Sequence, residues 1–142
     1  CPRCALLTEQ VGALVEQHGL PVRVRHLAFD AEDAAALARE RGCRVGTAKH
    51  VARDLGLEID VATIGTVIMD RRTAVAAARG IPPGEVPAAD TWTPRLDELL
   101  EPFRRRARDN DYLMTPVIVI DGEVVHHGSV PDEEALRRLI VR

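Results

Sequence analysis

Aromatic residues are scarce in this chain. Its 142 residues include two Phe, one Trp and one Tyr, so aromatics make up 3% of the sequence while hydrophobic residues make up 46%. A core built from this sequence must therefore be filled by Leu, Val, Ile and Ala. The length is that of one domain, with a subdomain at most.

The sequence also lacks a large excess of charge of one sign and long apolar runs. The formal net charge is −3, which gives no reason to expect nucleic-acid binding. No apolar run is long enough to span a bilayer, so no membrane span is predicted. The chain begins at Cys1 without a methionine, and we expect that an upstream stretch was removed or left unnumbered. The predicted compartment is the cytoplasm, or the periplasm if a signal peptide has been removed.

Cysteine is limited to three residues, an odd number that gives no disulfide framework. Two of the three form the motif Cys1-Pro2-Arg3-Cys4, which opens a pattern of apolar residues at helical spacing. Near the first turn of a helix, free N–H groups and the positive end of the dipole stabilise a thiolate. Pro2 suits a helix start and Arg3 adds a positive charge, so both are predicted to stabilise the thiolate. Cys1 is the predicted nucleophile, with a pKa in the range of about 3.5–7.5, and Cys4 the resolving thiol.

The stretch after the motif predicts a helix, a strand and a second helix. The first helix should end at Gly19. Alternating residues from Val22 to Phe29 then predict a strand. Asp30 is the expected N-cap of the second helix, which should end at Gly42.

Residues 43–113 are predicted to be mainly helical. Thr47 is placed to cap a short helix, and residues 59–80 are compatible with a longer one despite several β-branched residues. Thr93-Pro94 is a strong helix start, an N-cap followed by proline at the first position. Pro102 should kink or split the helix that follows.

The last segment has the clearest pattern. The apolar run Val117–Ile120 predicts a strand buried on both faces. Asp121-Gly122 is a hairpin signal, and Glu123 to His127 is the expected returning strand. Asp132 is the expected cap of a final helix.

These patterns together resemble the thioredoxin superfamily. The resemblance is carried by the Cys1–Cys4 motif at a helix start, by Thr115-Pro116 before a buried strand, and by the hairpin and final helix. The run from Met114 to Leu139 looks most like the small glutaredoxin-like thioredoxins. The resemblance implies that the Thr115–Pro116 bond is cis and lies beside Cys1. It also implies that Thr115 and Pro116 bind substrate, with the backbone of Thr115 free to pair with an extended chain.

The resemblance covers residues 1–42 and 114–142, which implies a thioredoxin-like α/β core. Residues 43–113 would then be a mainly helical insertion, similar to that of the Dsb-type disulfide oxidoreductases, and would cap the dithiol. The strand that precedes the motif in the superfamily has no counterpart here, so we expect it upstream, or supplied by another segment or chain. The double glycine that grips glutathione in many glutaredoxins is also absent, and no cofactor is predicted.

The predicted function is thiol–disulfide exchange with protein substrates. Cys1 would attack a substrate disulfide, and Cys4 would then release the reduced substrate from the mixed disulfide. The same steps in reverse would oxidise dithiols. The sequence predicts neither the direction nor the oligomeric state.

Two alternatives remain open. A metal-binding carrier or sensor could use Cys1 and Cys4, with Cys43 as a third thiolate, although no metal site is the leading prediction. The other alternative is a thioredoxin-like interaction protein that has lost turnover. Cys43 is otherwise expected to be a buried apolar residue. His126 and His127 point to opposite faces of a strand and are expected to be surface residues.

Overall fold

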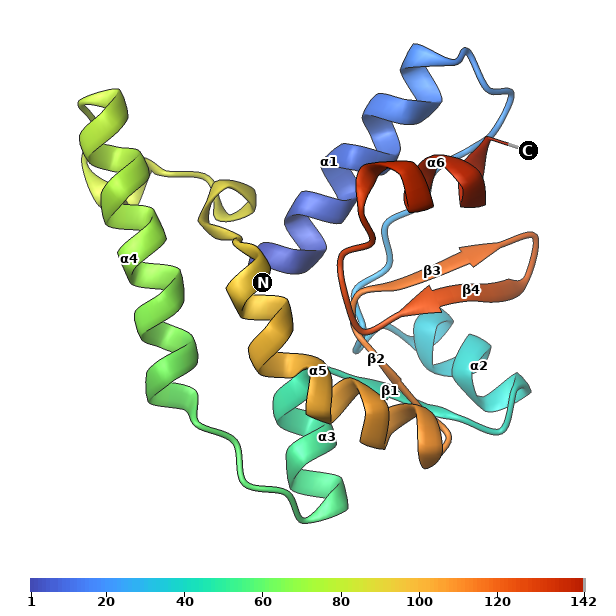
Figure 1. Ribbon diagram of the computed structural model, residues 1–142. Coiled ribbons are helices and arrows are strands. Elements are labelled where there is room, and N and C mark those ends of the chain that lie inside the picture. Colours follow the sequence, from blue (N-terminus) through green and yellow to red (C-terminus); the bar gives the residue numbers. More distant parts are fainter. Residues whose placement is uncertain (142) are drawn as a thin grey trace.

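The computed structural model describes residues 1–141, and its helices and strands are mixed along the chain (Figure 1). The helices are α1 (Pro2–Gln17), α2 (Glu32–Glu40), α3 (Ala48–Leu55), α4 (Val61–Arg79), α5 (Pro94–Asp109) and α6 (Glu133–Ile140), with short 3₁₀ turns η1 (Pro83–Glu85) and η2 (Ala88–Thr91). The strands are β1 (Arg44–Gly46), β2 (Tyr112–Met114), β3 (Val117–Ile120) and β4 (Glu123–His127). In residues 1–141 these strands form two small sheets, parallel β1–β2 and antiparallel β3–β4.

Helix α1 begins where the sequence predicted. Cys1 is its N-cap, and the Cys1 carbonyl accepts the N–H of Ala5 at 3.1 Å. Pro2 occupies the first helical position, where a missing N–H leaves no helical bond unmade. The first turn holds no acidic residue, so no carboxylate of that turn offsets the positive end of the helix dipole next to Cys1.

The strand predicted from Val22 to Phe29 is wrong. Residues 20–28 are irregular, and Val22 and Val24 are 54% and 46% exposed. Alternation alone does not make a strand, because a strand also needs a neighbour that accepts its hydrogen bonds, and none of the described strands pairs with this segment. The following helix begins one residue late, with Ala31 at its N-cap in place of Asp30.

The helices predicted in residues 43–113 are confirmed. Thr47 and His50 form a capping box at α3, and the carboxylate of Asp60 caps α4 by accepting the N–H of Thr63 at 3.0 Å. The strands β1 and β2 at the two ends of this stretch were not predicted. With three residues each, they are too short to show a period in the sequence.

The sequence predicted a kink or a split at Pro102, and the split does not occur, because α5 runs through the proline as one helix. Figure 1 shows α5 changing direction along its length, which agrees with a kink. Leu96 and Leu100 precede the proline and Ala107 follows it, and all three are buried in one cluster. Burial on both sides of Pro102 keeps α5 continuous, although the proline cannot donate a helical hydrogen bond.

The β3–β4 hairpin forms as predicted. Asp121 and Gly122 both have positive φ, 50° and 81°, as a tight two-residue hairpin turn requires. The register is shifted between Ile118 and Val119, which marks a bulge. The expectation that β3 is buried on both faces is wrong, because Ile118 alone in it is buried. A two-stranded hairpin packed on α1 and α6 through one face leaves its other residues half exposed.

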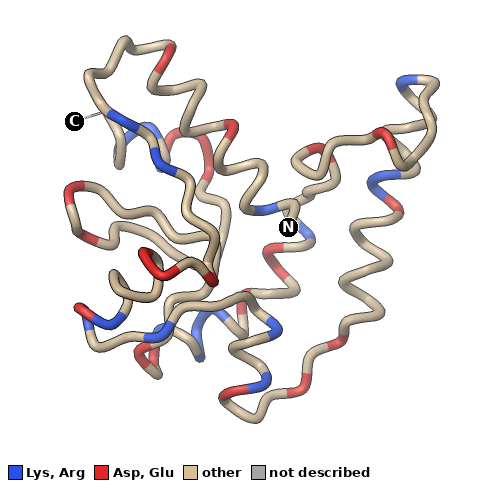
Figure 2. Tube along the Cα trace, turned by 180° about the vertical axis from the view of Figure 1, so that it is seen from behind, with Lys and Arg blue, Asp and Glu red and all other residues tan. Residues whose placement is uncertain are grey.

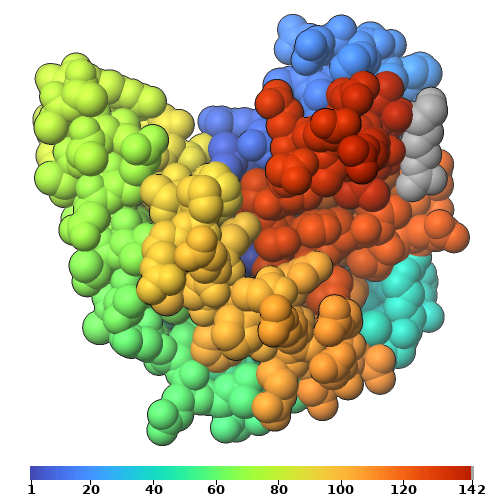
Figure 3. Space-filling view, viewed as in Figure 1, coloured from blue at the N-terminus to red at the C-terminus, as the bar shows by residue number. Residues whose placement is uncertain are grey.

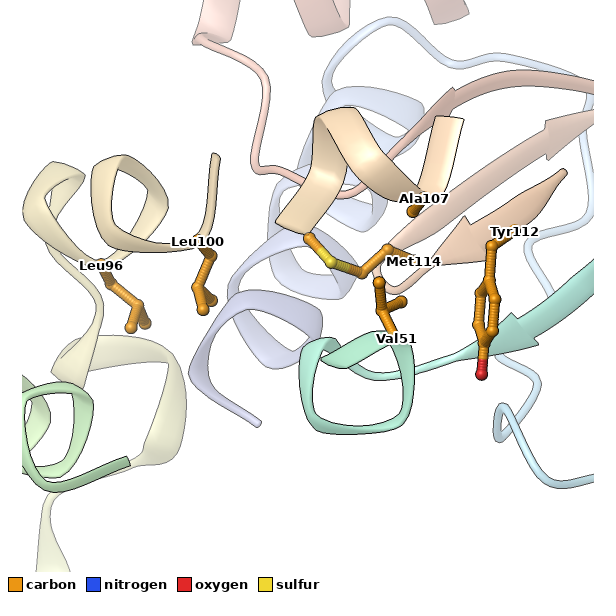
Figure 4. Packing of buried hydrophobic residues seen from close by; sticks show 6 residues of the cluster. All are labelled: Val51, Leu96, Leu100, Ala107, Tyr112 and Met114. Carbon is orange, nitrogen blue, oxygen red and sulfur yellow. The ribbon is translucent and has the colours of Figure 1, made fainter. Parts of the chain in front are cut away.

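Two main groups of buried residues hold the molecule together. One lies among α3, α5 and β2, where Met114 of β2 reaches between Val51 of α3 and Ala107 of α5 (Figure 4). The other joins α1, β3 and α6 through Leu7, Leu14, Ile118 and Leu136. The first group draws only on residues between β1 and β2, or in β2 itself; the second draws only on α1 and the C-terminal segment.

The surface carries both signs of charge throughout. Figure 2 shows acidic and basic residues interspersed along the trace, with neither sign confined to one part of the molecule. Within residues 1–141, no helix combines the length and the apolar character needed to cross a membrane.

Candidate dithiol site

Cys1 and Cys4 are free thiols with different exposure. Cys1 is exposed at the N-cap of α1, whereas Cys4, one turn further on, is partly buried. The prediction that Cys1 is the more accessible thiol is therefore confirmed. The carbonyl of Cys4 accepts a hydrogen bond from Thr8 Oγ1 at 2.8 Å, within the same helix.

Arg3 lies inside the protein, although the motif predicted a charge close to Cys1. Only 2% of the residue is exposed, and its Nε lies 2.9 Å from Oδ1 of Asp97 in α5. Its Nη2 is buried and has no hydrogen-bond partner among residues 1–141. Arg3 therefore anchors the first turn of α1 to α5 and keeps part of its hydrogen-bonding capacity unused.

Asp97 receives donors from three separate segments. Its Oδ1 is in contact with Arg3 of α1 and accepts a hydrogen bond from Trp92 Nε1 at 3.3 Å. Its Oδ2 accepts the backbone N–H of Val130 at 2.8 Å, from the loop before α6. One carboxylate thus fixes the dithiol helix, the start of α5 and the C-terminal loop relative to one another.

The charges around Arg3 act in opposite directions. Burial lowers the pKa of Arg3, whereas the carboxylate of Asp97 and the thiolate form of Cys4 raise it. Arg104 of α5 lowers it further by repulsion. Arg3 is thus in electrostatic contact with Cys4, the partly buried thiol of the pair.

His126 and His127 are half-buried, so the expectation that they are surface residues is wrong. His126 Nε2 lies 2.9 Å from the carbonyl oxygen of Ser129, and His127 Nδ1 accepts the N–H of Met114 at 3.4 Å. Burial is the main cause that lowers the pKa of each histidine, and the positive charge of Arg104 lowers both further. The hairpin lies against α5, where Arg104 Nε donates to the carbonyl of His127 at 3.0 Å.

The Thr115–Pro116 bond is cis, as the resemblance in sequence implied. The expectation that the backbone of Thr115 is free is wrong for its N–H, which donates to the carbonyl of Gly46 in β1 at 2.9 Å. The carbonyl of Pro116 accepts the N–H of Gly128 at 2.9 Å. Both residues are therefore held between the two sheets, and their contact with Cys1 and with substrate stays a prediction.

Cys43 does not join the other two thiols in a ligand set. Its Sγ lies 3.5 Å from the carbonyl of Arg41, at the end of α2. Within residues 1–141 no group of three His, Cys, Asp or Glu side chains is placed to hold a metal ion. A three-thiolate metal site that includes Cys43 would therefore need this part of the chain to rearrange.

A cleft of about 530 Å³ opens beside Asp97, between α1, α5 and α6. Figure 3 shows the blue α1 set between the yellow-orange α5 and the red α6. Gln10, Trp92 and Val130 line the cleft together with acidic residues of α5 and α6. The turn η2 packs against α1 as well, so the helical segment contacts the helix that carries the dithiol.

Sequence reasoning located the two cysteines and missed Asp97. This residue follows Pro94 in the first turn of α5, where acidic residues are common for helix-dipole reasons alone. Nothing in the sequence links it to Arg3, because the two meet only after folding. A comparison with protein-family models, with curated proteins and with solved structures finds no match for the chain.

Proposed function

We propose that this protein is a thiol–disulfide oxidoreductase that uses Cys1 and Cys4. The observation that carries the proposal is the unequal exposure of two free thiols one helical turn apart at the start of α1. Exchange needs an accessible attacking thiol and a second thiol close enough to complete the reaction, and this pair offers both.

The helix start favours the first chemical step. The free N–H groups of the first turn and the positive end of the α1 dipole stabilise negative charge at Cys1. The Cys1 thiolate attacks one sulfur of a substrate disulfide; a bond forms between the two sulfurs, and the second substrate sulfur leaves as a thiolate. Cys4 then attacks Cys1, closes the Cys1–Cys4 disulfide and releases the reduced substrate.

The fold proposed for this chemistry is a thioredoxin-like core of residues 1–42 and 114–142 with a helical insertion of residues 43–113. The separation of the two buried clusters supports this division, because one draws only on α1 and the C-terminal elements. The contact between η2 and α1 supports the role of the insertion as a cap beside the dithiol.

Substrate contact at Thr115 is limited by the hydrogen bonds of the structure. The N–H of Thr115 is taken by Gly46, so an extended substrate chain could pair only with the Thr115 carbonyl. We propose protein disulfides as the substrates, bound along this carbonyl and over the exposed Cys1.

The proposal is tested by trapping. In Cys4→Ser the nucleophile remains and the resolving thiol is lost, so the mixed disulfide with a substrate should accumulate. Incubation of Cys4→Ser with insulin should give an adduct that dithiothreitol releases. Cys1→Ser should give none, and Cys43→Ser, in which both site cysteines remain, is the matched control and should turn over insulin like the wild type.

Three outcomes would decide against the proposal. Trapping by Cys1→Ser alone would reverse the two roles. If no variant forms an adduct and the wild type does not reduce insulin, the protein is a binding module without turnover. If the wild type also retains stoichiometric zinc or copper(I) in the presence of reductant, and both cysteine variants lose it, the chain is a metal carrier.

A further inference from the structure

We infer that Asp97 is a positioning residue for the dithiol, which holds Arg3 beside Cys4 and offsets part of the positive charge that Arg3 directs at that sulfur. The inference rests on the proposed function, because it concerns the thiol that would resolve the mixed disulfide.

The geometry leaves Arg3 little freedom. Its side chain is 3% exposed and its Nε is 2.9 Å from Asp97, whose own side chain is 16% exposed. Asp97 in turn is fixed by Trp92 and by the backbone of Val130. A guanidinium held in this way cannot swing into solvent, so its charge stays within the protein next to the first turn of α1.

The contact with Asp97 leaves part of the hydrogen-bonding capacity of Arg3 unused. The Arg3 Nη2 group is buried without a hydrogen-bond partner among residues 1–141. The same guanidinium interacts favourably with the charged form of Cys4, and unfavourably with Arg104. Arg3 thus interacts with two anions, the carboxylate of Asp97 at 2.9 Å and the thiolate that Cys4, the next residue in the chain, forms when it reacts.

Several other charged or titratable residues lie on α1 and on the elements that pack against it. His126 of β4 interacts with both Arg3 and Asp97, and its pKa is lowered mainly by burial. On η2, Asp90 is paired with Arg79 at 2.7 Å. The remaining charged residues on α1 and on the packed helix α6 are Glu9, Glu16, Glu133, Glu134, Arg137 and Arg138.

The charges around Cys4 affect the step in which the mixed disulfide releases its substrate. The Cys4 thiolate attacks Cys1 in the mixed disulfide, the Cys4–Cys1 bond forms and the bond from Cys1 to the substrate sulfur breaks. The electron pair of the broken bond leaves with the substrate sulfur, which takes up a proton equivalent to the one that Cys4 lost. A positive charge beside Cys4 increases the fraction of thiolate, and the carboxylate of Asp97 restrains that increase.

The test uses the full chain with one cysteine left, Cys4, in the background Cys1→Ser/Cys43→Ser. The rate of iodoacetamide alkylation against pH then reports the ionisation of Cys4 alone. Asp97→Asn keeps the shape and removes the negative charge, so the alkylation midpoint should move to lower pH. Arg3→Gln removes the positive charge and leaves Asp97 unbalanced, so the midpoint should move to higher pH. Each shift should be about one pH unit, or tenfold in thiolate at a fixed pH below the midpoint.

The opposite signs separate electrostatics from loosened structure. Both substitutions break the same ion pair, so a purely structural role would move the two midpoints in the same direction. Asp109→Asn is the matched control, because it removes a carboxylate at the far end of α5 that pairs with the exposed Arg108. It should leave the midpoint unchanged.

The conservative variant Arg3→Lys keeps the charge and should stay near the parent midpoint. If Asp97→Asn does not fold, the contrast between Arg3→Gln and Arg3→Lys decides the question. Shifts of equal sign, or no shift, overturn the inference. The alkylation rate is measured without substrate turnover. The expected midpoint shifts can therefore be absent while insulin trapping succeeds, or present while insulin trapping fails.

Discussion

Gly46 occupies a position in β1 where a side chain has no room. A Cβ built on it would lie 2.8 Å from the Cβ of His50 and 2.9 Å from the hydroxyl of Tyr112. The His50 atom is the first of its side chain, so it cannot rotate away, and the histidine is held in the capping box of α3. The substitution Gly46→Ala therefore forces β1 and α3 apart.

The expected cost is that of an overpacked interior, about 1–3 kcal/mol. Part of it would be offset because alanine loses less backbone entropy than glycine on folding, an effect of about 0.5–1 kcal/mol. Displacement of β1 would also move the carbonyl of Gly46, which accepts the N–H of Thr115 at 2.9 Å. We therefore expect Gly46→Ala to slow insulin reduction as well as to lower stability.

Urea unfolding followed by circular dichroism measures the effect. With a slope of about 2 kcal/mol/M, a loss of 2 kcal/mol lowers the midpoint by about 1 M. Gly65→Ala in α4 is the control, because its new Cβ meets no atom within 4 Å. It should raise the free energy of unfolding by roughly 0.5–1 kcal/mol. If Gly46→Ala proves as stable as the wild type, the close packing of β1 on α3 described here is wrong.

Three further predictions concern other buried groups. Tyr112 is the sole tyrosine, and burial together with its hydrogen bond to Asp54 raises its pKa to about 12, so its ultraviolet titration should have that midpoint when folded and about 10 when unfolded. Stability from this neutral phenol is complete below pH ~10 and is lost between pH ~10 and 12, and a pH series of urea curves should lose that slope in Tyr112→Phe. Leu136→Ala, at a position with 0% exposure, should lose about 2–5 kcal/mol in the same assay, whereas Val61→Ala, at 46% exposure, should change stability by less than about 0.5 kcal/mol. Burial lowers the pKa of His127, so the contribution of the neutral imidazole to stability is complete above pH ~6.5 and is lost as pH falls through the lowered pKa. His127→Gln should therefore flatten the dependence of the urea midpoint on pH over that range. An unchanged pH dependence would contradict this account.

Local signals in the sequence were enough to predict most helices. The cap at Thr47, the proline at Pro94 and the turn at Asp121-Gly122 each act within a few residues, and the structure has a helix or hairpin at each. The exposure order of Cys1 and Cys4 followed from the same local reasoning, since the first residue of a helix is less covered than the fourth.

The errors arose where distant residues decide the outcome. The segment from Val22 to Phe29 has a strand pattern but no strand beside it among residues 1–141. The helix α5 is not split at Pro102, because residues distant in the sequence bury it on both sides of the proline. The position of Arg3 shows the same limit at the site. Arg3 was predicted to place its positive charge close to Cys1, and only the folded chain brings Asp97 to this charge.

The parallel pairing of β1 with β2 brings the two ends of the intervening helical segment together. Arg44, Val45 and Gly46 lie opposite Tyr112, Leu113 and Met114. The chain leaves this short ladder at Gly46 and re-enters it at Tyr112, on the neighbouring strand opposite Arg44. A segment whose ends are neighbours can be exchanged for another without displacing what lies outside it, as long as the replacement spans a parallel crossover of about a dozen residues or more. Grafting a different helical segment between these strands would retarget the surface beside the dithiol while Cys1 and Cys4 keep their own helix.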